Sequence, residues 1–260
     1  PPRSTLFPYT TLFRSMPDEK VALDGLSLSL ERGDFAVVIG SNGAGKSTMM
    51  NAISGALMLD KGSIHIAGED VTAMPVHARA RHVARVFQDP MKGTAATMTI
   101  AENMLLAEMR QNRARLRRGL TPARRDTYRE HLSYLGLGLE DRLDTPVSLL
   151  SGGQRQSLSL VMAVSGEPDI LLLDEHTAAL DPRTADLVLN ATLRAVTALK
   201  LTTMMVTHNM AHAIDYGNRI IMLDAGRVLL ELTGEDKARA TVPDLIGHFS
   251  VKSDRMLLGG

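Results

Sequence analysis

The residues best suited to chemistry form one loop, Gly40-Ser41-Asn42-Gly43-Ala44-Gly45-Lys46-Ser47. The loop follows the apolar run 35–39 and precedes a stretch of helical character from Thr48 to Ser54. Glycines let successive backbone N–H groups point at a phosphate, and a helix that starts at the loop adds the positive end of its dipole. Lys46 supplies a charge for the β- and γ-phosphates, and the Ser47 hydroxyl can ligate magnesium. Strand, loop and helix in this order predict a phosphate-binding loop rather than a glycine-rich turn without chemical function.

A second glycine-containing loop precedes a helical run that extends to Ser165, and it consists of Ser151-Gly152-Gly153-Gln154. Its serine can cap that helix, and its two glycines allow the backbone to approach an anion closely. Many proteins contain such a loop as a simple helix cap. The loop indicates a binding function here only because of the residues that follow it in the chain.

Two carboxylates follow the apolar run 170–173, which has the pattern of a buried parallel strand. In an α/β sheet, ligands bind at the carboxyl ends of the strands, so Asp174 and Glu175 are expected beside the phosphate loop. Adjacent residues of a strand point in opposite directions, which allows two separate roles. We expect Asp174 to hold magnesium through its water ligands and Glu175 to polarise the attacking water.

A histidine follows one more predicted strand, at 202–207. His208 is therefore expected at the same edge of the sheet, within reach of a γ-phosphate. His212 stands four residues later on a predicted helix, which superficially indicates a metal pair. The zinc-protease pattern requires a glutamate directly after the first histidine, and Asn209 occupies that position, so we do not expect this pair to bind metal.

The composition limits the classes of protein that can carry these motifs. With 260 residues the chain can form one large α/β domain or two small ones. Lys plus Arg and Asp plus Glu number 29 each, so the net charge does not indicate a nucleic-acid partner. The chain has no cysteine, which excludes disulfides and cysteine-ligated zinc. Its longest apolar runs, such as 170–173, are far shorter than the roughly 20 residues that span a bilayer.

The first fifteen residues differ in character from the rest of the chain. Residues 4–15 resemble a translated sequencing-library adapter, so we treat 1–15 as an artefactual leader and expect it to pack poorly. The segment has neither the uninterrupted apolar region nor the small-residue cleavage site of a signal peptide. We expect one domain over 16–250 and a short C-terminal tail at 251–260.

Alternation of apolar residues predicts a sheet interrupted by helices. Strands are predicted at 21–30, 35–39, 62–68, 83–87, 169–175, 202–207, 220–223 and 227–232. Helical spacing at 99–109 and 122–135 indicates a helical subdomain inserted at about 88–166, with a solvated basic loop at 110–125. The resulting fold class is α/β, with a parallel-rich core sheet and an antiparallel β portion on its N-terminal side.

The order and spacing of these motifs resemble the ATPase subunit of ABC transporters. The resemblance extends from about Val21 to Phe249 and rests on Gly40 to Ser47, Gln88, Leu150 to Gln154, Ile170 to Glu175, Asp181 and His208. It implies an ABC-type P-loop NTPase fold that binds ATP and Mg²⁺. It also implies a homodimer in which each ATP lies between the phosphate loop of one subunit and the signature loop, Ser151 to Gln154, of the other.

The resemblance assigns a role to each matched residue. Lys46, Gln88, Glu175 and His208 would be catalytic. ATP would be bound by Gly40 to Thr48 and, across the interface, by Ser151, Gly152, Gly153 and Gln154, while Asp181 would link the two sites. Ser47, Gln88 and Asp174 would hold the metal, and Gln88 would also relay the state of the site to a membrane partner.

Three further stretches, at 175–182, 205–210 and 244–249, resemble a subgroup of bacterial ATPases encoded with one permease and a periplasmic binding lipoprotein. The subgroup is often linked to the uptake of aromatic amino acids. The segment 142–148 lacks the Gly-Glu-Arg-Gly loop of many exporters, which favours an importer. We therefore expect a peripheral subunit on the cytoplasmic face of the inner membrane that powers uptake of a small solute, and we expect no nucleic acid. His176 departs from the family's usual proline, and we expect it to be a packing or loop residue.

Two other functions share these motifs. An exporter ATPase would differ mainly in its partners. A soluble ABC ATPase that acts on nucleic acid or ribosomes would be expected to carry a coiled coil, zinc cysteines or a second cassette, none of which this sequence contains. A non-hydrolysing regulatory subunit would be expected to lack Lys46, Glu175 or His208. Methionines at 91, 98, 104 and 109 could either fill a core or form an adaptable docking surface.

The family stacks the adenine ring on an aromatic residue of its N-terminal strand, and this chain has no aromatic residue between Met16 and Asp34. Tyr9 and Phe13 belong to the leader. We therefore expect ATP binding weaker by about 1–2 kcal/mol than in a chain with that aromatic residue.

Overall fold

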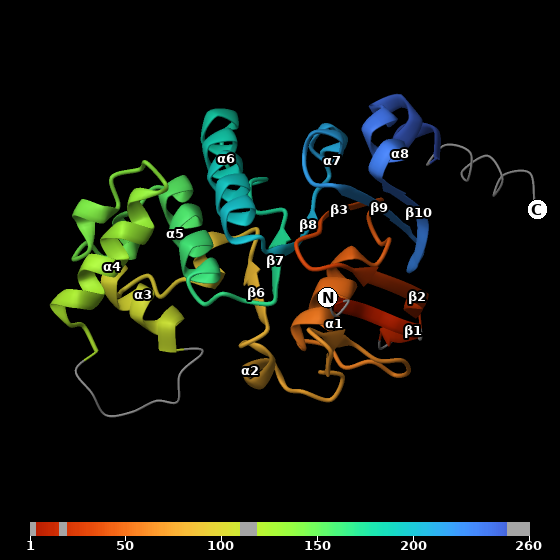
Figure 1. Ribbon diagram of the computed structural model, residues 1–260, viewed down its shortest axis with the longest axis horizontal. Coiled ribbons are helices and arrows are strands. Elements are labelled where there is room, and N and C mark those ends of the chain that lie inside the picture. Colours follow the sequence, from red (N-terminus) through yellow and green to blue (C-terminus); the bar gives the residue numbers. More distant parts are fainter. Residues whose placement is uncertain (1–3, 16–19, 110–118, 249–260) are drawn as a thin grey trace, which may run out of the picture.

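Figure 1 shows the computed structural model, which describes residues 4–15, 20–109 and 119–248, with only the backbone given for residues 4–15 and 20. Its strands are β1 (Ser4–Ser15), β2 (Lys20–Leu30), β3 (Phe35–Gly40), β4 (His65–Ile66), β5 (Glu69–Asp70), β6 (Val83–Val86), β7 (Ile170–Asp174), β8 (Thr202–Val206), β9 (Arg219–Asp224) and β10 (Arg227–Thr233). Its α-helices are α1 (Lys46–Ser54), α2 (Val76–Arg79), α3 (Ile100–Met109), α4 (Pro122–Ser133), α5 (Gly152–Val164), α6 (Pro182–Leu199), α7 (Met210–Asp215) and α8 (Gly234–Arg239).

The main sheet has the strand order β10-β9-β3-β8-β7-β6. All neighbours are parallel except β10, which runs antiparallel to β9. Two antiparallel pairs, β1 with β2 and β4 with β5, lie outside it. The predicted parallel-rich α/β sheet with an antiparallel portion is therefore confirmed. Because the parallel strands share one direction, the loops after β3, β7 and β8 leave the sheet at one edge.

The two faces of the main sheet carry separate apolar cores. Along β3, Val37 and Ile39 belong to one core and Ala36 and Val38 to the other, as the alternation of a strand requires. The first core also contains apolar residues of α3, α4, α5 and α6, whereas the second contains those of α1 and β2. Both faces are covered, which is why the strands are almost uniformly apolar.

Helices α3, α4 and α5 are all inserted between β6 and β7, which are hydrogen-bonded neighbours in the sheet. Figure 1 shows these helices grouped at one end of the molecule, with α6 between them and the C-terminal strands. This arrangement places the helix that follows the signature loop beside the sheet, because α5 contacts both β6 and α6.

Two expectations about the strands need correction. We expected the leader to pack poorly, whereas the backbone of Ser4–Ser15 pairs with β2, with register shifts at four places. An extended segment beside β2 can satisfy the hydrogen-bonding groups of a strand edge, whatever its side chains. The predicted strand at 62–68 is limited to His65–Ile66, since Gly62 and Gly68 have φ values of 96° and 84° and turn the chain.

Some predicted segments fall outside the described residues, namely 1–3, 16–19, 110–118 of the basic loop, and 249–260 with the tail. Among the helices of the described residues, none is long and apolar enough to cross a bilayer.

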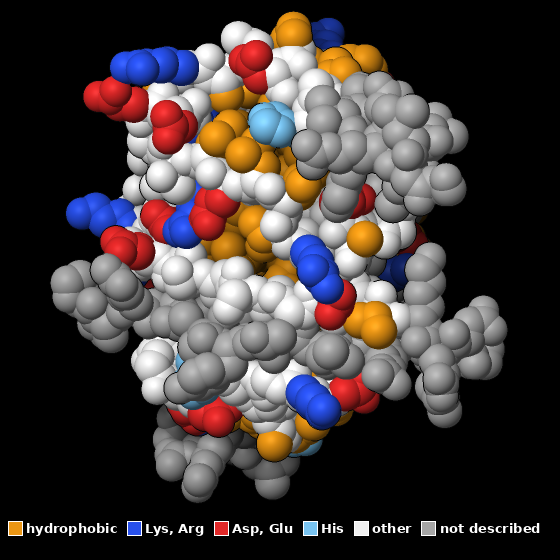
Figure 2. Space-filling model, turned by 90° about the vertical axis from the view of Figure 1, so that its right-hand side faces the viewer, with side chains coloured by type: hydrophobic (Ala, Val, Ile, Leu, Met, Phe, Trp, Pro, Cys, Tyr) orange, Lys and Arg blue, Asp and Glu red, His pale blue; other side chains and the backbone are white. Residues whose placement is uncertain are grey.

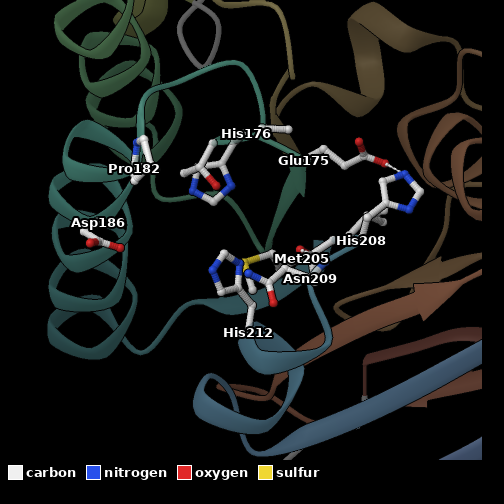
Figure 3. Close-up of a pocket in the computed structure, with 13 residues that line it drawn as sticks. Glu175, His176, Pro182, Asp186, Met205, His208, Asn209 and His212 are labelled. Carbon is white, nitrogen blue, oxygen red and sulfur yellow. Dashed lines mark hydrogen bonds and ion pairs between the residues drawn. The ribbon is translucent and has the colours of Figure 1, made fainter. Parts of the chain in front are cut away.

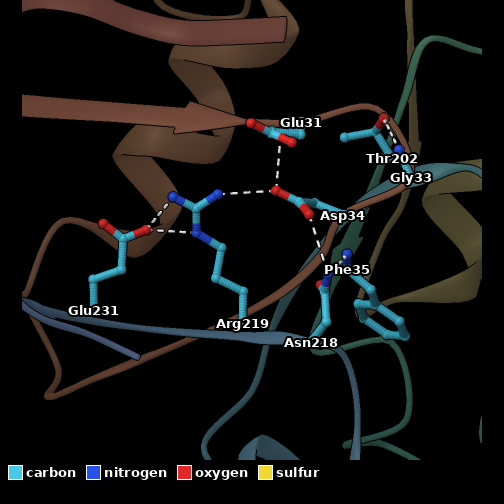
Figure 4. Close-up of polar contacts among 8 residues, drawn as sticks. All are labelled: Glu31, Gly33, Asp34, Phe35, Thr202, Asn218, Arg219 and Glu231. Atoms are coloured by element: carbon cyan, nitrogen blue, oxygen red, sulfur yellow. Dashed lines mark hydrogen bonds and ion pairs between the residues drawn. The ribbon is translucent and has the colours of Figure 1, made fainter. Parts of the chain in front are cut away.

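A polar network ties together segments from both ends of the sequence at the edge of the sheet where β3 begins (Figure 4). The Arg219 guanidinium donates to Asp34 Oδ2 at 2.9 Å and also pairs with Glu231. Asn218 donates to Asp34 Oδ1 at 3.1 Å and accepts from the backbone N–H of Phe35 at 2.8 Å. These contacts hold the starts of β3 and β9 side by side, on the edge of the sheet opposite the phosphate loop.

Candidate functional site

The phosphate loop joins the end of β3 to the start of α1, and its backbone requires glycine. Gly43 and Gly45 have φ values of 80° and 99°, in the left-handed region that disfavours side chains. A Cβ atom at Gly40 would lie 2.5 Å from the carbonyl oxygen of Leu223, and one at Gly45 would lie 2.7 Å from that of Ala22. The loop therefore passes between β9 and β2 where only backbone fits.

Helix α1 begins without a side-chain cap, because its N-cap residue is Gly45. The N–H groups of its first turn are thus left to an anion rather than to the protein's own oxygen atoms. Around them Ser41, Asn42 and Ser47 are exposed, and Thr48 is half-buried. The loop has the geometry of an anion-binding helix N-terminus that is accessible to solvent.

Lys46 lies inside this loop. It is 6% exposed, and its ammonium group donates to the carbonyl oxygens of Gly40 at 2.7 Å and Ser41 at 2.9 Å. Burial lowers the pKa of Lys46, while the negative charge of Glu175 opposes that effect. The lysine and the glutamate are therefore close enough to interact electrostatically, although they are 129 positions apart in the sequence.

The two carboxylates at the end of β7, Asp174 and Glu175, have different partners. Asp174 Oδ2 accepts from Arg85 Nη2 at 2.5 Å, and the Asp174 side chain is 18% exposed. Glu175 Oε1 lies 2.6 Å from His208 Nε2, and the Glu175 side chain is 16% exposed. Glu175 also has a φ of 45°, and its backbone N–H donates to the carbonyl oxygen of Val206 at 3.0 Å. The predicted proximity of His208 to the strand with the two carboxylates is confirmed.

Figure 3 shows Glu175 and His208 facing each other at one side of a cavity of about 350 Å³, with His176 and His212 farther from the glutamate. His176 is buried, and its Nε2 lies 3.2 Å from the Thr192 hydroxyl of α6. Burial lowers the pKa of His176 to about 4, with a smaller contribution from His212, so the ring is neutral near pH 7. Its expected role as a packing residue is consistent with this burial. In the described part of the chain no group of three His, Asp or Glu side chains is arranged to hold a metal ion.

The signature loop forms a capping box at the start of α5. Ser151 Oγ accepts from the backbone N–H of Gln154, and Gln154 Oε1 accepts from the backbone N–H of Ser151, both at 3.2 Å. A Cβ atom at Gly153 would lie 2.1 Å from Thr184 Cγ2 of α6. Asp181 caps α6 in turn, and its hydrogen bonds with Thr184 lower the pKa of its carboxyl group. The signature loop is thus packed against the start of α6.

Gln88 follows β6 and lines a groove of about 770 Å³ together with Asn51, Arg85 and Asp174. Gln88 therefore lies on the same side of the sheet edge as the carboxylate predicted to hold metal. Sequence reasoning missed Arg85 and Asn51, which meet in this groove. A signal existed, because Arg85 is the only charged residue of the run 83–87.

Comparison with known proteins places these features in a family. The family model described as "ABC transporter" matches residues 23–178. A tyrosine transport ATP-binding protein of Clostridioides difficile is 43% identical over 227 residues, which cover 87% of this chain and 90% of that protein. The aliphatic sulfonates import ATP-binding protein SsuB 1 of Mesorhizobium japonicum is 35% identical over 82% of this chain and 74% of its own length.

A third relative, the methionine import ATP-binding protein MetN of Brucella abortus, is 35% identical over 84% of this chain and 57% of its own length. Among solved structures, a dimeric ATP-binding cassette in a post-hydrolysis state with ADP and Pi matches with a TM-score of 0.74 and 27% identity, over 88% of this chain and 97% of that one. The ADP conformation of another cassette has the same fold, with a TM-score of 0.79, 24% identity, and coverage of 96% and 99%.

Proposed function

This chain belongs to the ABC transporter family and is an ATPase, and we propose that it powers the uptake of a small solute, such as an amino acid. The Glu175–His208 pair, 2.6 Å apart at the carboxyl ends of β7 and β8, is the observation that carries the hydrolytic role. The direction of transport is inferred from the relatives, whose names specify tyrosine transport and sulfonate and methionine import.

We assign ATP binding to Gly40 to Thr48, whose open helix N-terminus suits a phosphate. Lys46 would exchange its two carbonyl partners for phosphate oxygens. The oxygen donors of Ser47, Asp174 and Gln88 suit Mg²⁺, which prefers a hydroxyl, a carboxylate and water. Bound there, Mg²⁺ would neutralise charge on the phosphates.

In the proposed hydrolysis, Glu175 acts as the base. The Nε2–H of His208 donates to Glu175 Oε1 and orients the carboxylate, which leaves the other oxygen to take the proton of the attacking water. His208 would also reach the γ-phosphate. Asp174 pairs with Arg85 and Glu175 pairs with His208, so the base and the metal ligand stay separate.

We propose that the site is completed by a second copy of the chain. Ser151, Gly152, Gly153 and Gln154 would touch the γ-phosphate of the partner subunit's ATP, and Asp181 would link the two sites. The similar solved cassette is dimeric, which supports this arrangement. In domain terms we assign the ATPase to 16–250, with its helical subdomain at about 88–166.

A permease is the partner that an import ATPase requires, and we propose that it docks beside Gln88 and the inserted helices. Met91, Met98 and Met109 are 46%, 39% and 43% exposed, whereas Met104 is buried. The methionines thus divide into one that fills the core and three that can adapt to a partner. The subunit would then lie on the cytoplasmic face of the inner membrane, with a solute-binding lipoprotein acting on the permease from the other side.

A nucleic-acid partner is less well supported. On the described part of the face seen in Figure 2, Lys and Arg side chains are interspersed with Asp and Glu side chains, and no basic stripe is formed. An exporter remains the alternative that shares all the hydrolytic residues.

Co-expression with the neighbouring membrane genes, followed by purification of the chain and reconstitution into vesicles, tests the proposal. We expect a multi-span permease to co-purify, and we expect ATP to drive solute across the membrane into the compartment that contains the ATPase subunit. Transport away from the ATPase side would identify an exporter, and ribosomal or DNA-bound partners would contradict a transport role. Glu175→Gln is the matched control, since it should retain the partners and the bound ATP but lose turnover.

A further inference from the structure

One arginine lies within the apolar strand β6, where its neighbours Ala84 and Val86 are buried. Arg85 Nη1 donates to Asn51 Oδ1 at 2.7 Å, and Arg85 Nη2 donates to Asp174 Oδ2 at 2.5 Å. The Arg85 side chain is 12% exposed, and its guanidinium carbon lies 4.9 Å from the centre of the Phe87 ring. A charge in such a position requires partners, and Arg85 has them in two other elements of the fold.

The two partners belong to the elements that carry the proposed metal ligands. Asn51 stands four residues after Ser47 on α1, so both side chains lie on the same face of that helix. Asp174 ends β7. The guanidinium therefore bridges the helix of Ser47 and the strand of Asp174, and it lines the same groove as Gln88.

We propose that Arg85 is a built-in cation that neutralises Asp174 while no metal is bound, and so sets the Mg²⁺ concentration at which the site takes up its nucleotide. This inference rests on the metal role proposed for Asp174. The guanidinium of arginine is a permanent, delocalised positive charge. Metal binding must then either displace the guanidinium from the carboxylate or proceed against its positive charge.

The contacts of Arg85 allow such an exchange. Each terminal nitrogen makes one contact, and the buried Nε atom has no hydrogen-bond partner among the described residues. The bond to Asn51 and the stacking on Phe87 can hold the side chain in place when Asp174 is released. A purely structural ion pair, by contrast, would stabilise the fold without changing the demand for Mg²⁺.

The test is a titration of Mg²⁺ at a fixed concentration of a fluorescent ATP analogue, with the full chain and binding as the readout. In Arg85→Met, which removes the charge at similar length, we expect half-maximal binding at an Mg²⁺ concentration about tenfold lower, equivalent to about 1.4 kcal/mol. Arg85→Lys keeps the charge and should stay close to the unchanged chain. Arg81→Met is the matched control, since Arg81 pairs with Glu69 on the surface 2.7 Å away.

A second measurement guards against poor folding. Without Arg85 the half-buried carboxylate of Asp174 lacks a countercharge, so in EDTA the midpoint of thermal unfolding should fall in Arg85→Met. Mg²⁺ with nucleotide should raise that midpoint by more than in the unchanged chain. If Arg85→Met does not fold, Arg85→Gln carries the same expectations, because its amide can keep the bond to Asn51.

An unchanged or higher Mg²⁺ requirement in the folded charge-removing variant would overturn the proposal. Asp174→Asn separates this result from a failure of the proposed function. If Asp174→Asn raises the Mg²⁺ requirement but Arg85→Met does not lower it, only the role of Arg85 is wrong. If Asp174→Asn has no effect, the metal role of Asp174 is wrong as well.

Discussion

The phosphate loop and the signature loop are both glycine-containing starts of helices, but their contacts are of different kinds. The phosphate loop is held by distant segments, since Ala44 accepts from the backbone N–H of Gly226 at 3.0 Å and Gly45 lies against β2. The signature loop satisfies its own backbone through the Ser151–Gln154 capping box. One loop leaves its helix N–H groups open, whereas the other already occupies one of them with a serine hydroxyl.

This difference indicates how ATP would be divided between the loops. An open helix N-terminus framed by rigid neighbours can bind phosphate in a single chain. A loop whose backbone N–H groups are already capped within the same chain can add contacts only to a nucleotide that is bound by another subunit. The two loops therefore correspond to the two halves of the composite site proposed above, and variants of each should fail in different ways.

The largest effect is expected for Lys46→Ala. Loss of this charge should reduce hydrolysis about a hundredfold to a thousandfold, the range known for one charge-stabilising donor, and should weaken ATP binding. Gly152→Asp in the signature loop should reduce hydrolysis but leave ATP binding by the single chain unchanged, since the nearest atom to a Cβ at this position, Leu180 Cδ2, is 3.5 Å away.

Mixing these two inactive variants distinguishes a composite site from a site within one chain. A mixed dimer contains one intact phosphate loop facing one intact signature loop, so hydrolysis should partly return. Steady-state turnover of the mixture measures it, and a mixture as inactive as its components would contradict the division of the site.

A second effect concerns α6, the helix against which the signature loop packs. The Nε2 atom of His176 lies 3.2 Å from the Thr192 hydroxyl of this helix. Burial lowers the pKa of His176 from 6.5 to about 4. The unfolded chain takes up this proton near pH 6.5 and the folded chain does so only near pH 4. The free energy of unfolding should therefore fall as the pH drops through this window, by about 3 kcal/mol at most.

Urea unfolding of the unchanged chain and of His176→Gln between pH 7 and pH 4 checks this expectation. The glutamine amide can still donate to Thr192 but does not titrate, so the variant should lose less stability on acidification. Equal losses would show that other groups control the acid response.

A third comparison replaces one glycine of each loop with alanine. At Gly45, with a φ of 99° and a Cβ position 2.7 Å from a carbonyl oxygen, we expect a loss of about 2 kcal/mol. At Gly152 the nearest atom, Leu180 Cδ2, is 3.5 Å from the Cβ position, and the change should stay within about 0.5 kcal/mol. Urea midpoints provide both numbers, and similar losses would show that these two glycine positions do not differ in the space around them.

The smallest effect is expected for Ser151, where the contribution of helix capping to stability can be separated from a contribution to hydrolysis. Ser151→Ala should cost about 1 kcal/mol of unfolding free energy, as should Thr121→Ala, because the Thr121 hydroxyl accepts from the backbone N–H of Arg124 at the start of α4. Only the signature-loop variant should also slow hydrolysis. If both variants hydrolyse ATP at the unchanged rate, Ser151 acts as a helix cap alone.

The sequence was most informative where function lies in consecutive residues. The phosphate loop could be predicted because its glycines, lysine and serine follow one another, and the neighbourhood of Glu175 and His208 followed from the rule that parallel strands end at one edge. Arg85 could not be assigned in this way. Its partners, Asn51 and Asp174, lie 34 and 89 positions away, and pairing across such distances depends on which helix and which strand the sheet brings beside β6.

The capping role of Gln154 was hidden for a related reason. Its carboxamide turns back to Ser151, a local choice of side-chain rotamer that motif order does not reveal. The irregular pairing of β1 was missed because it depends on a free strand edge rather than on a side-chain pattern.

The strand order has a consequence for synthesis on the ribosome. The neighbours of β3 in the sheet are β8 and β9, which begin at Thr202 and Arg219, whereas β3 itself ends at Gly40. At a synthesis rate of about 5–20 residues per second, about 10–40 s pass between the synthesis of β3 and that of β9, its second neighbour. During that time an apolar strand with open edges is exposed to other nascent chains. Translation that stops before Arg219 should therefore yield an aggregation-prone fragment without a formed phosphate loop.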